Sequence, residues 1–179
     1  TLYLREFLAC QVSKALGWYL VPPTVVRDGP YGVGSVQLFI EHDPRVTYFS
    51  LGDGFVDQLQ RFAVFDYLVN NADRKGGHVL LDPRGRLWGI DHGLTFHAAL
   101  KLRTVVWEFS GQPVPLSLLR DVGSLREAVL APGGGLRERL DRYLSGREVR
   151  ALRDRVERLL ASGVFPSPGA GPSYPWPPV

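Results

Sequence analysis

One short hairpin bounded by two aspartates constrains the fold of this 179-residue chain more than any other stretch. Asp73 begins an Asp-Arg pair in a glycine-containing loop, and Asp91 follows 18 residues later, two residues before another glycine. Two apolar runs, residues 79–81 and 87–90, lie between them and flank the turn sequence Asp-Pro-Arg-Gly at 82–85. This order predicts a loop, a strand, a tight turn and a second strand. Such a hairpin would hold the two carboxylates near one point in space.

Two neighbouring carboxylates suit phosphoryl transfer, in which catalysis is mostly positioning and electrostatic stabilisation. One aspartate orients an attacking hydroxyl group, and the other holds the metal ion on the nucleotide phosphates. An isolated Asp-Arg pair is more often an exposed turn after a helix. The joined pattern, with two apolar strands at the right spacing, favours the chemical role.

Residues 73–78 (Asp-Arg-Lys-Gly-Gly-His) and 90–93 (Ile-Asp-His-Gly) resemble the catalytic and metal-binding loops of the phosphatidylinositol 3- and 4-kinase-like superfamily, which also includes the HipA-like bacterial protein kinases. Those families carry Asp-Arg-His-x-x-Asn, a hairpin, and then Ile-Asp-Phe-Gly or a similar sequence. The resemblance covers roughly residues 1–100 and is nearest to a group of uncharacterised actinobacterial kinase-like proteins. It implies an α+β, protein-kinase-like fold of two lobes, with an incomplete N-lobe and a mainly helical C-lobe.

The resemblance also implies a role for each residue of the two loops. Asp73 would be the catalytic group that orients the acceptor hydroxyl. Arg74 would hold the loop in place or offset the charge of the transferred phosphate, and Lys75 would contact the γ-phosphate unless it faces solvent. His78 and Asp91 would be the metal ligands, with Asp91 as the main one. The implied cofactors are ATP and Mg²⁺.

Two positions depart from the family pattern. Lys75 stands where the family has a histidine after Asp-Arg, and His78 stands where it has a metal-ligating asparagine. Histidine binds divalent metals, but Mg²⁺ prefers oxygen ligands. We therefore expect one of three arrangements: Mn²⁺ in place of Mg²⁺, a site for a single metal ion, or a degraded site that binds nucleotide and does little chemistry.

Residues 1–41 match the end of an N-lobe by resemblance. No methionine occurs anywhere, so we expect that an N-terminal portion with the glycine-rich loop and the phosphate-binding lysine is missing. Apolar residues recur with helical spacing over 2–16. Glu6 on this helix matches the glutamate that pairs with the nucleotide-binding lysine in kinases. A surface glutamate is the alternative.

A predicted hairpin follows, with strands at 24–27 and 35–41 around a turn at 28–34. By resemblance, the end of its second strand is the hinge whose backbone groups bind adenine. An ordinary amphipathic edge hairpin would show the same pattern. The candidates for adenine binding are Gln37, Leu38, Phe39 and Ile40.

Residues 42–164 match a kinase C-lobe. A helix over 55–69 precedes the catalytic loop and ends at a pair of asparagines, which tolerate left-handed backbone geometry. Asp66 on this helix either supports the loop by hydrogen bonds or lies on the surface. Residues 94–109 would be the activation-loop region, which meets the second substrate.

The last part of the chain is expected to be two helical stretches and a tail. The helices are predicted at 116–130 and 136–160, the second of them interrupted near 145–146. Residues 165–179 hold six prolines and predict a loose segment in extended or disordered conformation.

Composition narrows the function classes. Cys10 is the only cysteine, so the chain has no internal disulfide and no zinc ribbon, and we expect a reducing cytoplasm as its location. No apolar run approaches the ~20 residues that span a membrane. The net charge of +3 arises within residues 136–158, where eight arginines alternate with five acidic residues. Interspersed signs are typical of a solvated helix face, so no nucleic-acid partner is expected.

Together these features predict transfer of the ATP γ-phosphate to a hydroxyl group of a protein, a small molecule or a lipid, with ATP and this acceptor as partners. A catalytically weak pseudokinase that binds nucleotide and acts through a protein partner is one alternative. A metal-dependent hydrolase is another, because three histidines and a carboxylate fall within 20 residues: His78, Asp91, His92 and His97. Adjacent side chains on a strand point to opposite faces, which counts against a shared metal at Asp91 and His92.

Overall fold

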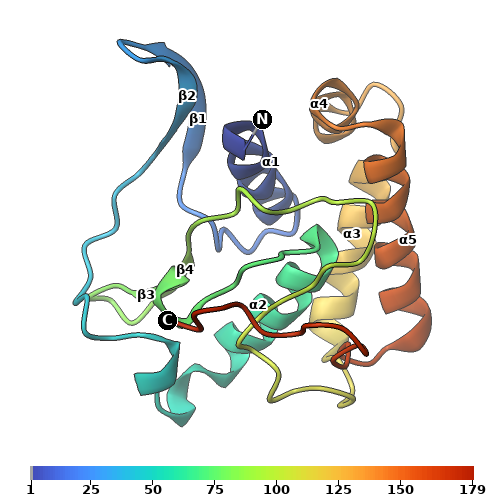
Figure 1. Ribbon diagram of the computed structural model, residues 1–179. Helices are drawn as coiled ribbons and strands as arrows, with labels where there is room; N and C mark the ends of the chain where they lie inside the picture. Colours follow the sequence, from blue (N-terminus) through green and yellow to red (C-terminus); the bar gives the residue numbers. More distant parts are fainter. Residues whose placement is uncertain (1) are drawn as a thin grey trace.

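The computed structural model describes residues 2–179 and combines two short antiparallel hairpins with five α-helices (Figure 1). The α-helices are α1 (Leu2–Ala15), α2 (Val56–Val69), α3 (Leu116–Leu130), α4 (Gly135–Tyr143) and α5 (Gly146–Ser162). The strands are β1 (Thr24–Gly29), β2 (Gly32–Gln37), β3 (Val79–Leu81) and β4 (Leu87–Gly89). Three short 3₁₀ helices are η1 (Tyr48–Ser50), η2 (Asp53–Phe55) and η3 (Gly76–His78). No helix within residues 2–179 has both the length and the apolar character needed to cross a membrane.

The first hairpin, β1–β2, projects from the rest of the molecule in Figure 1. Its register runs from Thr24 opposite Gln37 to Gly29 opposite Gly32, so only two residues form the turn. The bounds predicted for the second strand, 35–41, were wrong at both ends: pairing begins at Gly32 and stops at Gln37. A two-residue turn fixes the register, and the positive φ of Gly32 (100°) lets pairing reach into the expected loop.

The second hairpin, β3–β4, follows the predicted pattern closely. Val79 pairs with Gly89, and the turn lies at the Asp-Pro-Arg-Gly sequence. Asp82 stabilises this turn, because its Oδ1 accepts hydrogen bonds from the backbone N–H groups of Arg84 and Arg86, each at 2.9 Å. The hairpin therefore connects the two aspartate loops as the sequence indicated.

One hydrophobic core connects α1 with the helices of the predicted C-lobe. Leu8 and Val12 of α1 are fully buried with Phe62 of α2, Val122 of α3 and Leu152 of α5. The helix that the sequence assigned to the end of an N-lobe thus packs on the C-lobe helices. The predicted domain boundaries themselves, 1–41, 42–164 and 165–179, stay predictions.

Helix α2 ends at an asparagine, as predicted. Asn70 adopts the left-handed conformation (φ 54°, ψ 56°), and its buried side chain donates to the carbonyl groups of His97 and Ala99 at 2.8 Å. Its Oδ1 also accepts a hydrogen bond from the N–H of Lys101 at 2.8 Å. The residue that ends the helix therefore also fixes the path of the later segment that passes the catalytic loop.

The proline-rich tail is not loose, which corrects the expectation for residues 165–179. Phe165 is 2% exposed, and the carbonyl group of Ser173 accepts hydrogen bonds from Thr104 N–H (3.1 Å) and Trp107 Nε1 (3.0 Å). Extended proline-rich backbone makes no internal hydrogen bonds, so its carbonyl groups remain available to other segments. The tail uses them to attach along the surface (Figure 1).

Glu148 joins two distant helices and should make stability depend on acid pH. It forms a capping box with Ser145 at the start of α5 and accepts a hydrogen bond from Arg5 of α1 at 2.5 Å. Burial alone would raise the pKa of Glu148, but these hydrogen bonds outweigh burial and lower the pKa from its usual 4.5. A lowered carboxyl pKa stabilises the fold above the unfolded value and loses that effect as pH falls through the folded value.

We expect Glu148→Gln to lower the free energy of unfolding by about 1 kcal/mol near neutral pH, because the charge-assisted bond to Arg5 is lost. The difference from the wild type should shrink as the pH falls below 4.5, where the wild-type carboxylate also becomes protonated. Urea unfolding at several pH values measures this. Glu157→Gln at an exposed ion pair with Arg126 is the matched control and should have little effect at any pH. A pH-independent loss in Glu148→Gln would contradict the prediction.

Candidate active site

The loop after α2 holds Asp73 at the surface by bonds to residues on either side. The Asp73 N–H donates to Oδ1 of Asn71 at 3.0 Å, and the N–H of Ala72 donates to the Leu94 carbonyl at 3.0 Å. The Asp73 side chain is 28% exposed, and its Oδ2 lies 3.9 Å from Nζ of Lys75. The carboxylate predicted to orient an acceptor is thus accessible on a loop whose backbone is fixed.

Arg74 is fully buried beneath this loop, and every one of its five N–H groups has a partner. Nε and Nη2 donate to the carboxylate of Asp66 at 3.1–3.2 Å. Nη1 donates to the carbonyl groups of His78 (3.2 Å) and Ile90 (2.9 Å), and Nη2 also donates to Nε2 of His92 at 2.6 Å. One guanidinium therefore joins the catalytic loop to the loop that carries the second aspartate.

Arg74 was predicted among the catalytic residues, with two possible roles. Direct contact with a transferred phosphate does not fit a side chain that is 0% exposed. The structure instead gives Arg74 the other role, holding the loop, because buried guanidinium groups are stable only when paired and hydrogen-bonded.

Asp66 is buried and pairs with Arg74. Of its two predicted roles, it therefore supports the loop by hydrogen bonds and does not lie on the surface. It is 0% exposed, and besides Arg74 it accepts hydrogen bonds from Nδ2 of Asn71 (3.0 Å) and Oγ1 of Thr104 (3.2 Å). Neither Asn71 nor Thr104 was singled out from the sequence. Asn71 was read only as a helix terminator, and Thr104 lies in a segment without clear periodicity, so no sequence signal indicated either contact.

His78 and Asp91, the two predicted metal ligands, face each other. Nε2 of His78 lies 3.4 Å from Oδ2 of Asp91, and Nδ1 of His78 lies 3.1 Å from the carbonyl oxygen of Asp73. The carbonyl can only accept, so Nδ1 carries the proton and Nε2 presents a lone pair when the imidazole is neutral. Burial, followed by the charge of Arg74, lowers the pKa of His78 and favours this neutral form.

In this neutral tautomer, the pair places a nitrogen lone pair of His78 opposite a carboxylate oxygen of Asp91. Asp91 is 58% exposed and adopts a positive φ of 57°, which is uncommon outside glycine, so the loop presents its carboxylate outward at some conformational cost. A divalent cation fits two such donors, because waters and phosphate oxygens can complete its coordination.

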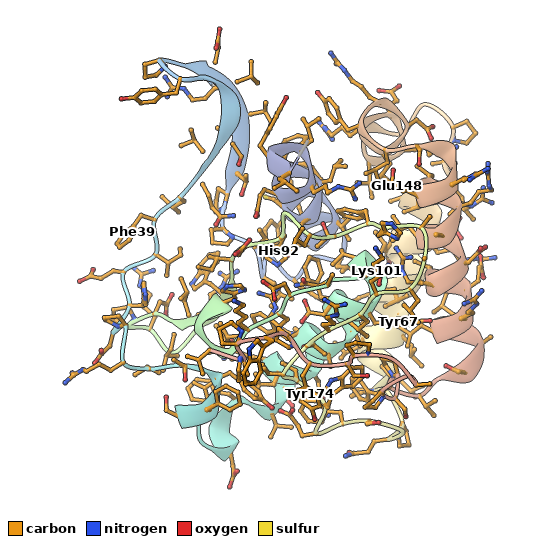
Figure 2. All side chains as sticks on the ribbon, in the orientation of Figure 1. Phe39, Tyr67, His92, Lys101, Glu148 and Tyr174 are labelled. Carbon is orange, nitrogen blue, oxygen red and sulfur yellow. The ribbon has the colours of Figure 1, made fainter. Side chains whose placement is uncertain are left out.

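His92 packs inward on the other side of Asp91. It is 0% exposed, lies edge-to-face with Phe65 (centroids 5.6 Å apart), and is seen beneath α1 at the centre of Figure 2. Its Nε2 accepts from Arg74, so the neutral ring carries its proton on Nδ1. Burial and then the charges of Arg74 and His78 lower the pKa of His92 well below its ordinary value.

Glu6 lies beside the same loop, which places the predicted α1 glutamate at the site. Its Oε2 is 3.8 Å from Nδ1 of His92. Burial raises the pKa of Glu6, while the backbone N–H groups of His92 and Gly93 act in the opposite direction. Among residues 2–179, this contact of Glu6 is with the neutral ring of His92 and not with a lysine, so the pairing of Glu6 with a nucleotide-binding lysine stays a prediction.

Two of the four hinge candidates are used inside the first hairpin. Nε2 of Gln37 donates to Oγ1 of Thr24 at 2.8 Å, and the N–H of Leu38 donates to the Pro23 carbonyl at 2.9 Å. The Gln37 side-chain amide and the Leu38 N–H are therefore already hydrogen-bonded within the protein.

Phe39 and Ile40 differ from these two. The Ile40 side chain is 9% exposed, and its carbonyl group lies 2.7 Å from Nδ1 of His42. Phe39 is 81% exposed on the extended connection after β2 (Figure 2), and within residues 2–179 its N–H and carbonyl groups have no hydrogen-bond partner. Phe39 is thus the candidate whose backbone is open to adenine.

The alternative metal centre of three histidines and Asp91 is not assembled. Across the described part of the chain, no three His, Cys, Asp or Glu side chains are placed to hold a metal ion together. His92 is buried against Arg74, and His97 is exposed, with Nδ1 accepting from the N–H of Ala99 at 3.0 Å. The hydrolase interpretation was wrong because these histidines serve separate hydrogen bonds.

Comparisons with known proteins find related sequences. A model of the phosphatidylinositol 3- and 4-kinase family matches residues 25–128. Protein Rv2133c of Mycobacterium tuberculosis is 39% identical over 212 residues, covering 99% of this chain and 75% of that protein. Phosphatidylinositol 4-kinase gamma 4 of Oryza sativa subsp. japonica is 31% identical over 108 residues, 55% of this chain and 19% of that kinase.

One solved structure has a similar fold. The Helicobacter pylori proinflammatory kinase CtkA superposes with a TM-score of 0.53 and covers 92% of this chain and 81% of its own, at 13% identity. At so low an identity the likeness concerns the fold alone.

Proposed function

Because this chain belongs to the phosphatidylinositol 3- and 4-kinase family, we propose that it transfers the γ-phosphate of ATP to a hydroxyl group of a protein, a small molecule or a lipid. The resemblance drawn from the two aspartate loops and the kinase-like α+β fold are confirmed by these comparisons. The observation that carries the proposal is the contact between Nε2 of His78 and the Asp91 carboxylate, directly beside the Asp73 loop.

Asp91 and His78 are the residues that would hold the metal ion of the reaction. Bound there with ATP, Mg²⁺ or Mn²⁺ would neutralise charge on the nucleotide phosphates. The mixed oxygen and nitrogen donors suit Mn²⁺ at least as well as Mg²⁺, because imidazole is a better ligand for the softer ion. The neutral state of His78, favoured by its burial, keeps Nε2 available as a donor.

Asp73 would act on the acceptor. Its partly exposed carboxylate accepts a hydrogen bond from the attacking hydroxyl, aligns the oxygen and takes up the proton as the phosphate is transferred. Lys75, 3.9 Å from the same carboxylate, would supply a positive charge at the phosphate edge of the site. Arg74 acts through these residues by fixing the two loops relative to each other.

The nucleotide base would lie at the free backbone of Phe39, after the first hairpin. Glu6 would complete the phosphate side from α1, where its Oε2 lies 3.8 Å from Nδ1 of His92. The acceptor would approach along residues 94–109, because Asn70 and Arg74 fix that segment next to the catalytic loop.

Calorimetric titration with ATP, in the presence of Mg²⁺ and then Mn²⁺, tests the proposal. We expect metal-dependent binding in the wild type that is lost in Asp91→Asn, because one of the two protein donors loses its charge. Asp154→Asn, at an exposed position of α5, is the matched control and should bind like the wild type. Failure of the folded wild type to bind ATP with either metal would contradict the proposal.

A nucleotide-binding pseudokinase is the second candidate function, because His78 offers the metal a nitrogen ligand in place of the family's asparagine oxygen. Following ATP consumption by the same protein separates the two. Metal-dependent binding with phosphate transfer supports the kinase, whereas equally tight binding without turnover supports the pseudokinase.

A further inference from the structure

The C-terminal segment, residues 165–179, meets the catalytic loop at a point that no role described above explains. In Figure 1 this segment crosses in front of α2 and ends beside β3. Near its end, the carbonyl group of Pro178 accepts a hydrogen bond from the N–H of Gly76 at 2.7 Å. Gly76 lies three residues after Asp73 and begins η3, which carries His78. The tail therefore holds the peptide between the acceptor-orienting aspartate and the metal-ligating histidine.

A second contact ties the tail to the same loop through an intermediate layer. The N–H of Arg74 donates to the Arg103 carbonyl at 2.9 Å, and the N–H of Val105 donates to the Arg74 carbonyl at 3.2 Å. Thr104 lies between Arg103 and Val105, and its N–H donates to the carbonyl group of Ser173 at 3.1 Å. Backbone hydrogen bonds thus join the catalytic loop to residues 103–105, and residues 103–105 to the tail. Near its end, the tail contacts the catalytic loop again through Pro178.

Gly76 shows that this approach is close. A Cβ atom on Gly76 would lie 2.7 Å from Cε2 of Phe49 and 3.5 Å from the Pro178 oxygen. The loop is therefore flanked by Phe49 of η1 on one side and the tail on the other, and a larger residue would require the Phe49 ring or the loop to shift. The neighbouring Gly77 faces open space, with nothing within 4 Å of a Cβ atom, so the tight packing is specific to one position.

The tail is held mainly by its backbone and not by its large side chains. Tyr174 and Trp176 are 58% and 89% exposed, whereas Pro175 between them is buried. Phe165, at the start of the segment, is anchored in the core beside Phe109. The last residues other than Pro175 can therefore be altered without removing a buried side chain.

We infer that residues 173–178 are a positioning element of the active site: the Ser173 and Pro178 carbonyl groups fix the catalytic loop in the arrangement that aligns Asp73 with His78. This inference rests on the proposed function for its consequence, which is that turnover requires the tail. Backbone misplacement of about 1 Å in a catalytic loop costs on the order of a hundredfold in rate, so one lost tether at Gly76 has a measurable effect.

Four variants of the full-length chain test this inference. In the tail variant, Tyr174 and residues 176–178 are replaced by glycine or serine and the buried Pro175 is kept, which preserves the chain length and adds no charge. Gly76→Ala forces the loop or the Phe49 ring to shift, and a third variant combines the two changes. Gly54→Ala, outside the catalytic loop, is the matched control, since its Cβ meets nothing.

The measurements are amide hydrogen exchange of residues 73–78, ATP affinity, and turnover of ATP with Mg²⁺ or Mn²⁺ and water as the acceptor. We expect faster exchange at Gly76 in the tail variant, a turnover number at least about tenfold lower, and a KM for ATP within about twofold of the wild type. Gly76→Ala should also lower turnover, because the contact with Phe49 shifts the loop that Pro178 holds. The combined variant should lose less than the product of the two single losses, because both changes displace the same loop. Gly54→Ala should behave as the wild type.

Higher turnover in the tail variant would overturn the inference, because the tail would then be an inhibitory cover. Unchanged exchange at Gly76 and unchanged turnover would overturn it too, since the tail would be passive. If the wild type does not consume ATP, the proposed function fails, and the exchange rate of Gly76 still decides whether the tail fixes the loop.

Discussion

Replacing Arg74 by methionine is expected to lower the free energy of unfolding by about 3–5 kcal/mol, because it leaves the Asp66 carboxylate buried without its counter-ion. Both side chains are 0% exposed, so no water reaches Asp66 to replace the lost bonds. The substitution also frees the carbonyl groups of His78 and Ile90, which Arg74 holds at 3.2 and 2.9 Å. Urea unfolding monitored by circular dichroism measures the change.

The matched control is the same substitution at an exposed ion pair. Arg45→Met removes a pair with Asp43 in which the arginine is 88% exposed, so unfolding should be almost unaffected. A double variant, Asp66→Leu with Arg74→Met, should be more stable than the sum of its single variants predicts, because it removes both buried charges together. A loss in Arg74→Met no larger than in Arg45→Met would show that the buried pair does not matter.

The largest expected effect on activity is at Asp73. Asp73→Asn should reduce phosphate transfer by about 10²–10⁴-fold, because an amide cannot take up the proton of the acceptor hydroxyl. ATP affinity should change little, since the pair proposed to hold the metal ion, His78 and Asp91, is untouched. Turnover of ATP measured together with calorimetric ATP binding checks both parts.

Asp154→Asn again serves as the control, because it removes one carboxylate from an exposed helix position far along the chain. If Asp73→Asn loses ATP binding together with turnover, Asp73 contributes to the nucleotide site. If it retains full turnover, the acceptor is oriented by another group, and the proposed role of Asp73 is wrong.

Local signals were sufficient to predict the hairpin that carries the site. The turn at Asp82 and the apolar runs beside it fix β3 and β4 by short-range chemistry, and Asn70 marks the end of α2 through its tolerance of positive φ. The approach of His78 to Asp91 follows from the same hairpin, whose strands are only three residues long.

The contacts that organise the site depend on partners far apart in sequence. The sequence offered a supporting role for Arg74 and Asp66 as one option, but not the residues that they contact. Arg74 bonds to Asp66 eight residues before it and to His92 eighteen residues after it, and nothing in its neighbours shows that it points inward. The attachment of Pro178 to Gly76 joins segments about a hundred residues apart. A proline-rich composition predicts an extended backbone, but not the surface on which that backbone lies.

Every N–H group of the Arg74 side chain is hydrogen-bonded, and this constrains how the protein can evolve. Changing Asp66 or Arg74 first leaves a buried charge without its partner, at a cost comparable to the whole stability of many domains. Any lineage that replaces one member must therefore begin from an unusually stable background or change both within a short interval. We expect residues 66, 74 and 92 to covary among relatives as one unit, while the exposed loop positions around them diverge independently.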